Sequence, residues 1–324
     1  MRNALNGIAL SAMVLGVAAC GGGGSGSQAP AIIQVPVFAP IPPATVATPA
    51  VVDNTGKLVT NLSVRQNGVD YYQSGMYIVV NNNWGADKFG MVYGKDYTQT
   101  VTYNKLTMPD GTLFTWDYPD QPYGDGAVVY GYPSVAFGKT TLGLTGYNTE
   151  NALSQVKNIT KFSETFDVML SGDLKYMNLM SDLFFFDHAG KIAAEITFNI
   201  HPSDHIIYWS DSANYFGQQP GAHNHQITMN GVLYDILVST DPTGTKAIII
   251  TPEDNKTKIT MGTIDWVKVF DVLDDDLDIR PEWYVKGVEL GVEVQAGNGS
   301  MLVNDFSVVY TYLDVNNSYV TLGQ

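Results

Sequence analysis

Two carboxylates, Asp182 and Glu195, lie within residues 180–201, a segment whose residue pattern predicts a β-hairpin. The Asp-His-Ala-Gly loop between the two strands ends in a glycine, which accommodates the positive φ that hairpin turns require. If Phe186 pairs with Lys191 across this loop, Asp182 lies directly opposite Glu195. Like charges at opposed positions of a sheet reduce stability, so such a pair shares a proton or serves a function. A solvated strand face in another register is the alternative.

Side chains alternate between the two faces of a strand, and this alternation separates the hairpin into a polar and an apolar face. The polar face of the second strand carries Ala193, Glu195, Thr197 and Asn199. The apolar face carries Ala194, Ile196, Phe198 and Ile200, together with Leu183 and Phe185 of the first strand. We therefore expect one face to be buried in a core and the other to present the carboxylates.

Residues 285–295 predict a second strand with acidic side chains. Its core-facing positions are Val288, Leu290, Val292 and Val294. Its other face consists of Gly287, Glu289, Gly291, Glu293 and Gln295. Glycines on a polar face leave room for a ligand against the sheet, although a solvated face gives the same pattern.

Residues 77–85 predict a third strand on which Asn82 and Trp84 share a face. An amide beside a large flat ring suits a sugar, whose hydroxyls form hydrogen bonds while its apolar face stacks on aromatic rings. A tryptophan at the end of a strand more often serves ordinary packing.

The three segments together resemble glycoside hydrolase family 12, a family of endoglucanases and xyloglucanases with a β-jelly-roll fold. Its Asn-Asn-Leu-Trp-Gly motif is similar to Asn81-Asn82-Asn83-Trp84-Gly85, and its Tyr-Pro element to Tyr132-Pro133. Its Asp-Ile-Trp element is similar to Asp182-Leu183-Phe184, its Glu-Ile-Met-Ile-Trp motif to residues 195–199, and its Gly-Thr-Glu motif to Gly291-Val292-Glu293. The motifs follow the family order over roughly residues 75–312.

The resemblance implies a retaining hydrolase in which Glu195 is the nucleophile, Glu293 the acid/base and Asp182 the partner that orients Glu195. Glu289 then becomes a neighbouring subsite or solvated residue. The expected sugar contacts are Asn82, Trp84, Trp116, Tyr132, Thr197, Asn199 and Gln295. Phe184, Thr197 and Asn199 depart from the family motifs, which leaves the glycan open. The resemblance implies no cofactor and no metal.

The first 50 residues carry signals for export rather than for folding. Residues 1–19 predict a signal peptide, and Val-Ala-Ala-Cys at Cys20 resembles the lipobox of bacterial lipoproteins. Residues 20–50 are rich in Gly, Ser and Pro, which predicts a tether. We therefore expect a lipid anchor at Cys20 and a place in the bacterial cell envelope.

Residues 51–324 predict one all-β domain. Short alternating segments rich in Val, Tyr and Thr recur throughout, which favours a jelly-roll sandwich of two antiparallel sheets with one helix packed outside. That helix is expected over 264–277, with Thr263 as its cap and Trp266, Phe270, Leu273 and Leu277 as its apolar stripe. A calcium site at Asp274-Asp275-Asp276 is a minor alternative.

The net charge of −15 and the pI near 4.5 argue against nucleic-acid binding and favour a neutral polysaccharide as the ligand. The five histidines lack a zinc-binding motif, so surface or loop histidines are expected. A lectin-like glycan-binding protein on the same sandwich is the main alternative function. A polysaccharide lyase is disfavoured because the polar faces contain no tyrosine or histidine base and no cation. We expect a monomer.

Overall fold

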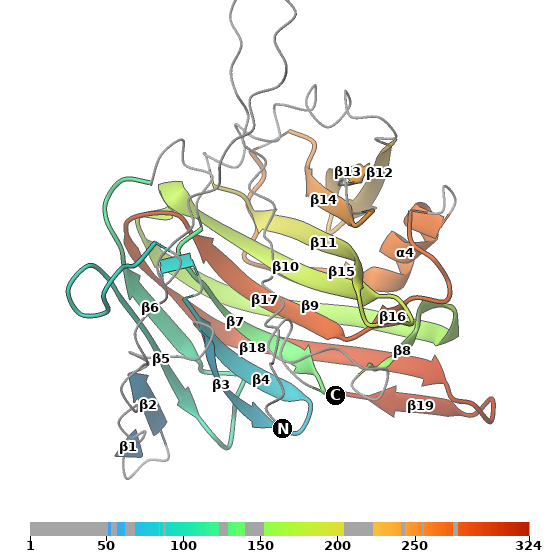
Figure 1. Ribbon diagram of the computed structural model, residues 1–324, viewed down its shortest axis with the longest axis horizontal. Helices are drawn as coiled ribbons and strands as arrows, with labels where there is room; N and C mark the ends of the chain where they lie inside the picture. The colour runs from blue at the N-terminus through green and yellow to red at the C-terminus, as the bar shows by residue number, and fades with distance from the viewer. Residues whose placement is uncertain are drawn as a thin grey trace, which may run out of the picture.

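The computed structural model describes two β-sheets packed face to face (Figure 1). It covers residues 51–52, 57–61, 69–83, 85–86, 89–122, 129–139, 152–203, 223–240, 244–254, 256–274 and 278–323. The expected signal peptide, Cys20 and the tether all lie outside these residues. The jelly-roll sandwich predicted from the sequence is confirmed.

Sheet A has eight strands. In spatial order they are β1 (Val51–Val52), β2 (Lys57–Asn61), β5 (Thr98–Asn104), β6 (Leu113–Asp117), β18 (Asn298–Leu313), β9 (Ile159–Gly172) and β15 (Met261–Asp265), with β19 (Tyr319–Leu322) paired to β18.

Sheet B has eleven strands. Its order is β12 (His223–Met229), β13 (Val232–Thr240), β14 (Lys246–Pro252), β11 (Ile192–His201), β10 (Met177–Phe186), β17 (Gly287–Val294), β7 (Tyr132–Gly138), β4 (Tyr77–Asn82) and β3 (Val69–Ser74). The short strands β16 (Tyr284–Val285) and β8 (Ser154–Gln155) extend it beside β10. Two 3-10 turns, η2 (Val156–Asn158) and η3 (Leu174–Tyr176), flank β9.

Every strand pair is antiparallel except one, among the residues that the structure describes. β11 pairs with β14 in parallel, from Ala194 beside Lys246 to Phe198 beside Ile250. The expectation of purely antiparallel sheets is therefore wrong at this pair. The β12–β13 hairpin turns at Asn230 and Gly231, whose φ angles of 51° and 75° are those of the Asn-Gly turns that favour tight hairpins.

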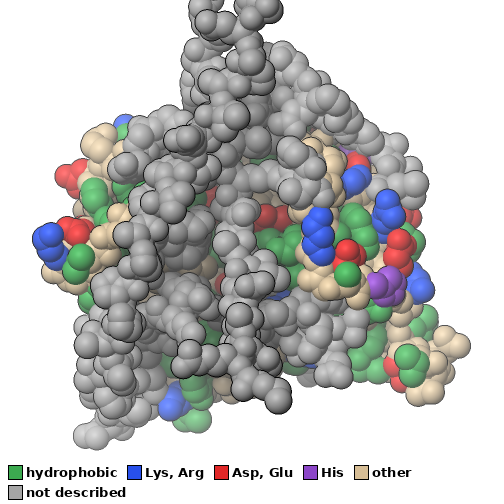
Figure 2. All heavy atoms as spheres, viewed as in Figure 1, with side chains coloured by type: hydrophobic (Ala, Val, Ile, Leu, Met, Phe, Trp, Pro, Cys, Tyr) green, Lys and Arg blue, Asp and Glu red, His purple; other side chains and the backbone are tan. Residues whose placement is uncertain are grey.

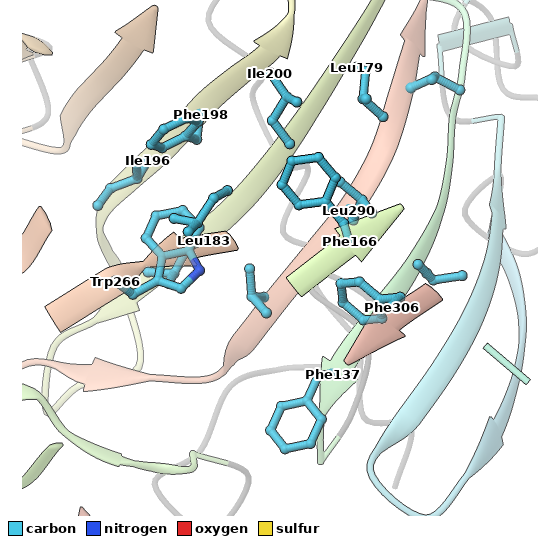
Figure 3. Close-up of a cluster of buried hydrophobic side chains, with 14 of the residues drawn as sticks. Phe137, Phe166, Leu179, Leu183, Ile196, Phe198, Ile200, Trp266, Leu290 and Phe306 are labelled. Atoms are coloured by element: carbon cyan, nitrogen blue, oxygen red, sulfur yellow. The ribbon is translucent and has the colours of Figure 1, made fainter. Parts of the chain in front are cut away.

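The hydrophobic core fills the space between the inner faces of the two sheets (Figure 3). Sheet B supplies Leu183, Ile196, Phe198, Ile200 and Leu290, and sheet A supplies Phe166 and Phe306. The alternation read from the sequence is confirmed, because the apolar positions of β11 and β17 are fully or almost fully buried. Burial of large side chains at roughly 25 cal/mol per Å² makes this core the main stabilising contribution.

The helix α4 (Trp266–Asp274) begins later than the sequence suggested. Asp265 caps it by accepting a hydrogen bond from the Lys268 N–H at 3.3 Å, whereas Thr263 lies in β15 opposite Thr165. Residues 261–265 form a strand because β9 offers a free edge for pairing. Leu277 and the second and third aspartates of the acidic run lie outside the described residues.

The apolar face of α4 contacts the inner faces of both sheets. The Trp266 ring lies 6.1 Å from the Phe162 ring of β9 and 6.0 Å from the Phe198 ring of β11. The Phe270 ring lies 5.4 Å from that of Phe185 on β10. The helix thus covers one end of the core, which differs from the expected position on the outside of a sheet. Within the described residues, no helix has the length and apolarity needed to span a membrane.

Candidate functional site

The β10–β11 hairpin places Asp182 and Glu195 on one face, in a register that differs from the expected one. Asp182 lies opposite Thr197, and Phe184 lies opposite Glu195. The expectation that the two carboxylates face each other directly is therefore wrong. They are diagonal neighbours, a position at which residues lie about 7–8 Å apart and their Cβ atoms somewhat closer, so long side chains can bridge the gap.

The turn and a bulge explain the shift. The Asp187 N–H donates to the Lys191 carbonyl at 2.9 Å. Lys191 is therefore bonded to Asp187 rather than to Phe186, and the loop is one residue shorter than expected. Gly190 has the positive φ that the loop needs (77°), and a bulge follows between Phe185 and Phe186. These two single-residue shifts add up to two, and a shift of two keeps every side chain on its predicted face.

Strand β17 lies on the other side of β10 and brings two more carboxylates onto this face. Glu289 lies directly opposite Asp182, and Glu293 lies opposite Asn178. Glu289 is 4% exposed, so the expectation that it is a solvated residue is wrong. We call Asp182, Glu195, Glu289 and Glu293 the carboxylate face.

Neutral donors hold two of these carboxylates. Ser134 of β7 donates from Oγ to Glu289 Oε1 at 2.5 Å. Asn178 Nδ2 donates to Asn199 Oδ1 at 2.8 Å and lies 3.3 Å from Glu293 Oε2. Asn178 therefore connects Glu293 on β17 with β11, the strand that carries Glu195.

Burial raises the pKa of every member of the carboxylate face. The pKa of Glu195 is raised to about 7, by burial and by the charge of Glu293. The pKa of Glu293 is raised by burial and lowered in part by its hydrogen bond from Asn178. The pKa of Asp182 is raised well above its usual range by burial and by the charges of Glu195, Glu289 and Glu293. Carboxyl groups that raise one another's pKa hold protons at pH values where isolated ones are ionised.

The glycines of β17 allow close packing rather than leaving room for a ligand. A Cβ on Gly291 would lie 2.6 Å from the Ser134 Cβ and 2.8 Å from the Tyr132 ring. Tyr132 is buried and donates from its hydroxyl to the Glu289 backbone carbonyl at 2.9 Å. Its ring thus lies over β17, on the same face of sheet B as the carboxylates.

The other predicted sugar contacts fall into three groups. By strand alternation, Asn82, Thr197, Asn199 and Gln295 share the carboxylate-bearing face of sheet B, although Asn199 and Gln295 are almost fully buried. Trp84 lies outside the described residues. Trp116 belongs to β6 of sheet A and is part of the hydrophobic core, so its prediction as a sugar contact is wrong.

A hydrogen-bonded tyrosine stack supports the strand end that carries Asn82. Gln99 Nε2 donates to Asn81 Oδ1 at 2.6 Å and to the Asn82 carbonyl at 3.0 Å, and Tyr118 donates to Gln99 Oε1 at 2.9 Å. The Tyr118 ring stacks at 5.0 Å on that of Tyr97. Asn83 Nδ2 donates to the Tyr97 hydroxyl at 2.6 Å. The two asparagines that flank Asn82 are therefore buried, and Gln99 fixes the Asn82 backbone.

Sequence reasoning missed a buried cation beside the carboxylates. Lys286 lies between β16 and β17 and is 1% exposed. From Phe185 to Asp182, β10 advances three residues while its partner advances four, from Val285 to Glu289, so one extra residue is accommodated next to Lys286. Burial lowers the pKa of Lys286 to about 8, while the Glu289 charge acts to raise it. No pattern in the sequence marks this bulge.

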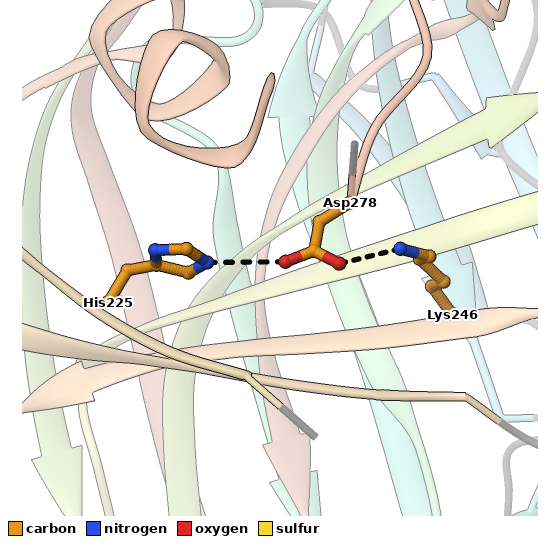
Figure 4. Close-up of polar contacts among 3 residues, drawn as sticks. All are labelled: His225, Lys246 and Asp278. Atoms are coloured by element: carbon orange, nitrogen blue, oxygen red, sulfur yellow. Dashed lines mark hydrogen bonds and ion pairs between the residues drawn. The ribbon is translucent and has the colours of Figure 1, made fainter. Parts of the chain in front are cut away.

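Two further buried carboxyl groups lie away from this face. Asp278 accepts from Lys246 Nζ at 2.6 Å and lies 3.2 Å from His225 Nε2 (Figure 4). Glu164 of β9 is fully buried in the core and accepts from Ser181 Oγ at 2.7 Å and from Trp266 Nε1 at 3.0 Å. Acidic side chains are also visible near the centre of the face shown in Figure 2, beside hydrophobic ones.

No protein-family model matches this sequence, and no curated protein sequence matches it. Solved structures do match the fold. The catalytic domain of Humicola grisea Cel12A, in complex with a thio-cellotetraose, superposes with a TM-score of 0.55 at 15% identity, covering 74% of this chain and 95% of that one. The family 12 xyloglucanase of Bacillus licheniformis gives a TM-score of 0.52 at 16% identity and covers 78% and 99%.

The xyloglucanase domain of NopAA, a type three effector from Sinorhizobium fredii crystallised with cellobiose, gives a TM-score of 0.51 at 15% identity, with coverage of 82% and 98%. At these identities the likeness concerns the fold. This chain therefore has the jelly-roll fold seen in glycoside hydrolase family 12, as its sequence motifs predicted.

Proposed function

We propose that this chain is an endo-acting hydrolase of a neutral β-glucan or xyloglucan that works with retention of anomeric configuration. One observation carries the proposal. Glu195, Asp182 and Glu293 lie on one face of three neighbouring strands, and the charge of Glu293 acts on both other carboxyls. The fold shared with family 12 endoglucanases and xyloglucanases supports it further.

The chemistry needs one carboxylate and one carboxylic acid across the scissile bond. Glu195 attacks the anomeric carbon while Glu293 gives its proton to the leaving oxygen, and Glu293 later takes a proton from the water that releases the sugar. Both groups are at least partly removed from water, which raises both pKa values, and the charge of Glu293 raises the pKa of Glu195 further, so the two carboxyls titrate as a coupled pair. The reaction uses the state of this pair in which Glu195 is ionised and Glu293 holds the proton.

The remaining polar residues of the face are assigned to binding and orientation. Asp182, diagonal to Glu195, orients the nucleophile. Asn82 and Thr197 are partly exposed on the same face and contact sugar hydroxyls. No cofactor is required for this reaction.

Enzymatic assays of single variants test the proposal. The wild-type protein should release reducing ends from xyloglucan or mixed-linkage β-glucan, and proton NMR should show the β-anomer forming first. Glu195→Gln and Glu293→Gln should each lower kcat at least about 1,000-fold. Asp235→Asn removes a carboxylate from the same face of β13, three strands from β10, and should keep the activity.

Rescue separates the two roles. With an aryl glycoside that needs no acid catalysis, Glu293→Ala should regain turnover on addition of azide and form a β-glycosyl azide. An α-product, or Glu195→Gln as active as the wild type, would refute the assignment. Glycan binding without any hydrolysis by the wild type would instead identify a lectin-like protein.

We also propose that the chain is a lipoprotein anchored through Cys20 in a bacterial cell envelope. The lipobox-like residues before Cys20 and the Gly/Ser/Pro-rich segment after it support this. Mass spectrometry of the mature N-terminus should find acyl chains on Cys20, and an unmodified N-terminus in a protein free of membranes would contradict the anchor.

A further inference from the structure

Asp182 and Glu289 form a buried pair of like charge at the centre of sheet B. They are direct cross-strand partners on β10 and β17 and are 6% and 4% exposed. Directly opposed residues in an antiparallel pair have Cβ atoms about 4.5–5.5 Å apart. At that distance and in low dielectric, ionisation of one carboxyl strongly opposes ionisation of the other.

The surroundings of the two carboxyls differ, and the difference decides which one holds the proton. Glu289 accepts a 2.5 Å hydrogen bond from Ser134 and feels the positive charge of Lys286, and both favour its ionised form. Asp182 instead feels the negative charges of Glu195 and Glu293, which favour its protonated form.

The hydrogen bonds of Asp182 also favour its protonated form. Among the described residues, the backbone N–H of Leu183 is the hydrogen-bond donor that favours its ionised form. Its Oδ1 atom is buried and makes no hydrogen bond within the part of the chain that the structure describes. A buried oxygen without a donor is a poor site for negative charge and a suitable site for a proton.

We infer that Glu289 is a positioning residue: its carboxylate, held by Ser134 and Lys286, keeps Asp182 protonated, so that Asp182 donates a hydrogen bond to Glu195. The last step rests on the proposed function, whereas the protonation of Asp182 does not. The other titratable group packed against the pair is Tyr132, whose pKa is raised well above its usual value by burial, so it stays neutral.

Carbon-13 NMR of the protein labelled at aspartate side-chain carboxyls tests the inference directly. The Asp182 resonance is the one missing from Asp182→Asn. In the wild type it should titrate well above the usual range for aspartate. In Glu289→Gln its midpoint should fall by about one pH unit or more, because the neighbouring charge is gone. A midpoint that stays the same or rises would overturn the inference.

Two variants with smaller expected shifts of the Asp182 midpoint, and one control, complete the test. Ser134→Ala and Lys286→Met each remove one group that stabilises the Glu289 carboxylate, so the proton moves toward Glu289 and the Asp182 midpoint falls, by less than in Glu289→Gln. They decide the question if Glu289→Gln fails to fold. Asp235→Asn should leave the Asp182 midpoint unchanged, and a fall of the same size in this control would overturn the inference.

Kinetics then connect the pair to catalysis. In Glu289→Gln the alkaline limb of the pH profile of kcat/KM should move to lower pH, because Asp182 loses its proton earlier. A merely structural role of Glu289 would lower activity without moving that limb. A wild type inactive on every glucan would refute the proposed function, while the NMR titration would still decide which carboxyl holds the proton.

Discussion

Two buried carboxylate clusters on opposite faces of sheet B show how differently the same side chain can be accommodated. By alternation along β14, Lys246 and its partner Asp278 lie on the core side, whereas Ala247, beside Glu195, lies on the carboxylate side. Asp278 has two basic neighbours, at 2.6 and 3.2 Å. Asp182 has three acidic ones.

The difference separates a cluster suited to a structural role from one suited to catalysis. A buried carboxylate bonded to a lysine and a histidine connects the elements that carry them, here β12, β14 and the segment after α4. Buried carboxyls that face one another lower stability unless some are protonated, and packing alone gives no reason to keep them. A cluster of mutually raised pKa values on one face is a feature of catalytic sites.

Removing the lysine beside Asp278 should cause the largest loss of stability. Lys246→Met leaves Asp278, whose side chain is 1% exposed, without its shorter contact. We expect a loss of about 2–4 kcal/mol in the free energy of unfolding, measured by urea denaturation. The double variant Lys246→Met with Asp278→Asn should recover much of this loss. A loss below about 1 kcal/mol would show that the ion pair contributes little.

Neutralising Glu289 should instead increase the free energy of unfolding at high pH. Its pKa in the folded protein is raised from 4.5 to about 7, so its contribution to stability is full below pH 4.5 and is lost as the pH rises through about 7. From pH 5 to pH 8, Glu289→Gln should therefore gain about 2 kcal/mol relative to the wild type. Urea denaturation at both pH values measures the gain, and parallel pH dependence of the two proteins would contradict it.

Glu164 is intermediate between the two clusters, because neutral donors surround it in place of basic or acidic groups. Burial raises its pKa to about 7, and the hydrogen bonds from Ser181 and Trp266 lower it in part. Ser181→Ala should reduce stability by about 1–2 kcal/mol at pH 8, where the carboxylate is ionised, and by less at pH 5, because hydrogen bonds to charged groups are stronger. Equal losses at both pH values, in the same urea experiments, would argue that Glu164 does not titrate between them.

The sequence predicted the faces of the strands far better than their registers. Side chains alternate strictly, so Glu195 and Glu293 and the core positions of their strands could be assigned from spacing alone. The register of the hairpin depends on how Asp187 closes the turn and on a bulge beside Phe186, and neither follows from residue type. The pairing of Asp182 with Glu289 depends on topology, because residues far apart in the chain form β10 and β17.

Other misassignments have similar physical causes. Trp116 has a flat ring of the kind that stacks on sugars, but only the order of strands places it in sheet A and in the core. Thr263 suits a helix cap as well as Asp265 does, and pairing with β9 decides between them. The sequence motifs, by contrast, indicated the fold because they occur in an order that reflects the whole topology.

The strand order of sheet B also determines when the carboxylate face can form during synthesis. Strands β10 and β11 are neighbours in the chain and can pair as soon as both have left the ribosome. Strand β17, with Glu289 and Glu293, begins only at Gly287, well after β11 ends at His201, and must insert between β10 and β7. The nascent hairpin therefore exposes Asp182 and Glu195 to water, and the acidic groups are brought together and dehydrated only in the last stage of assembly.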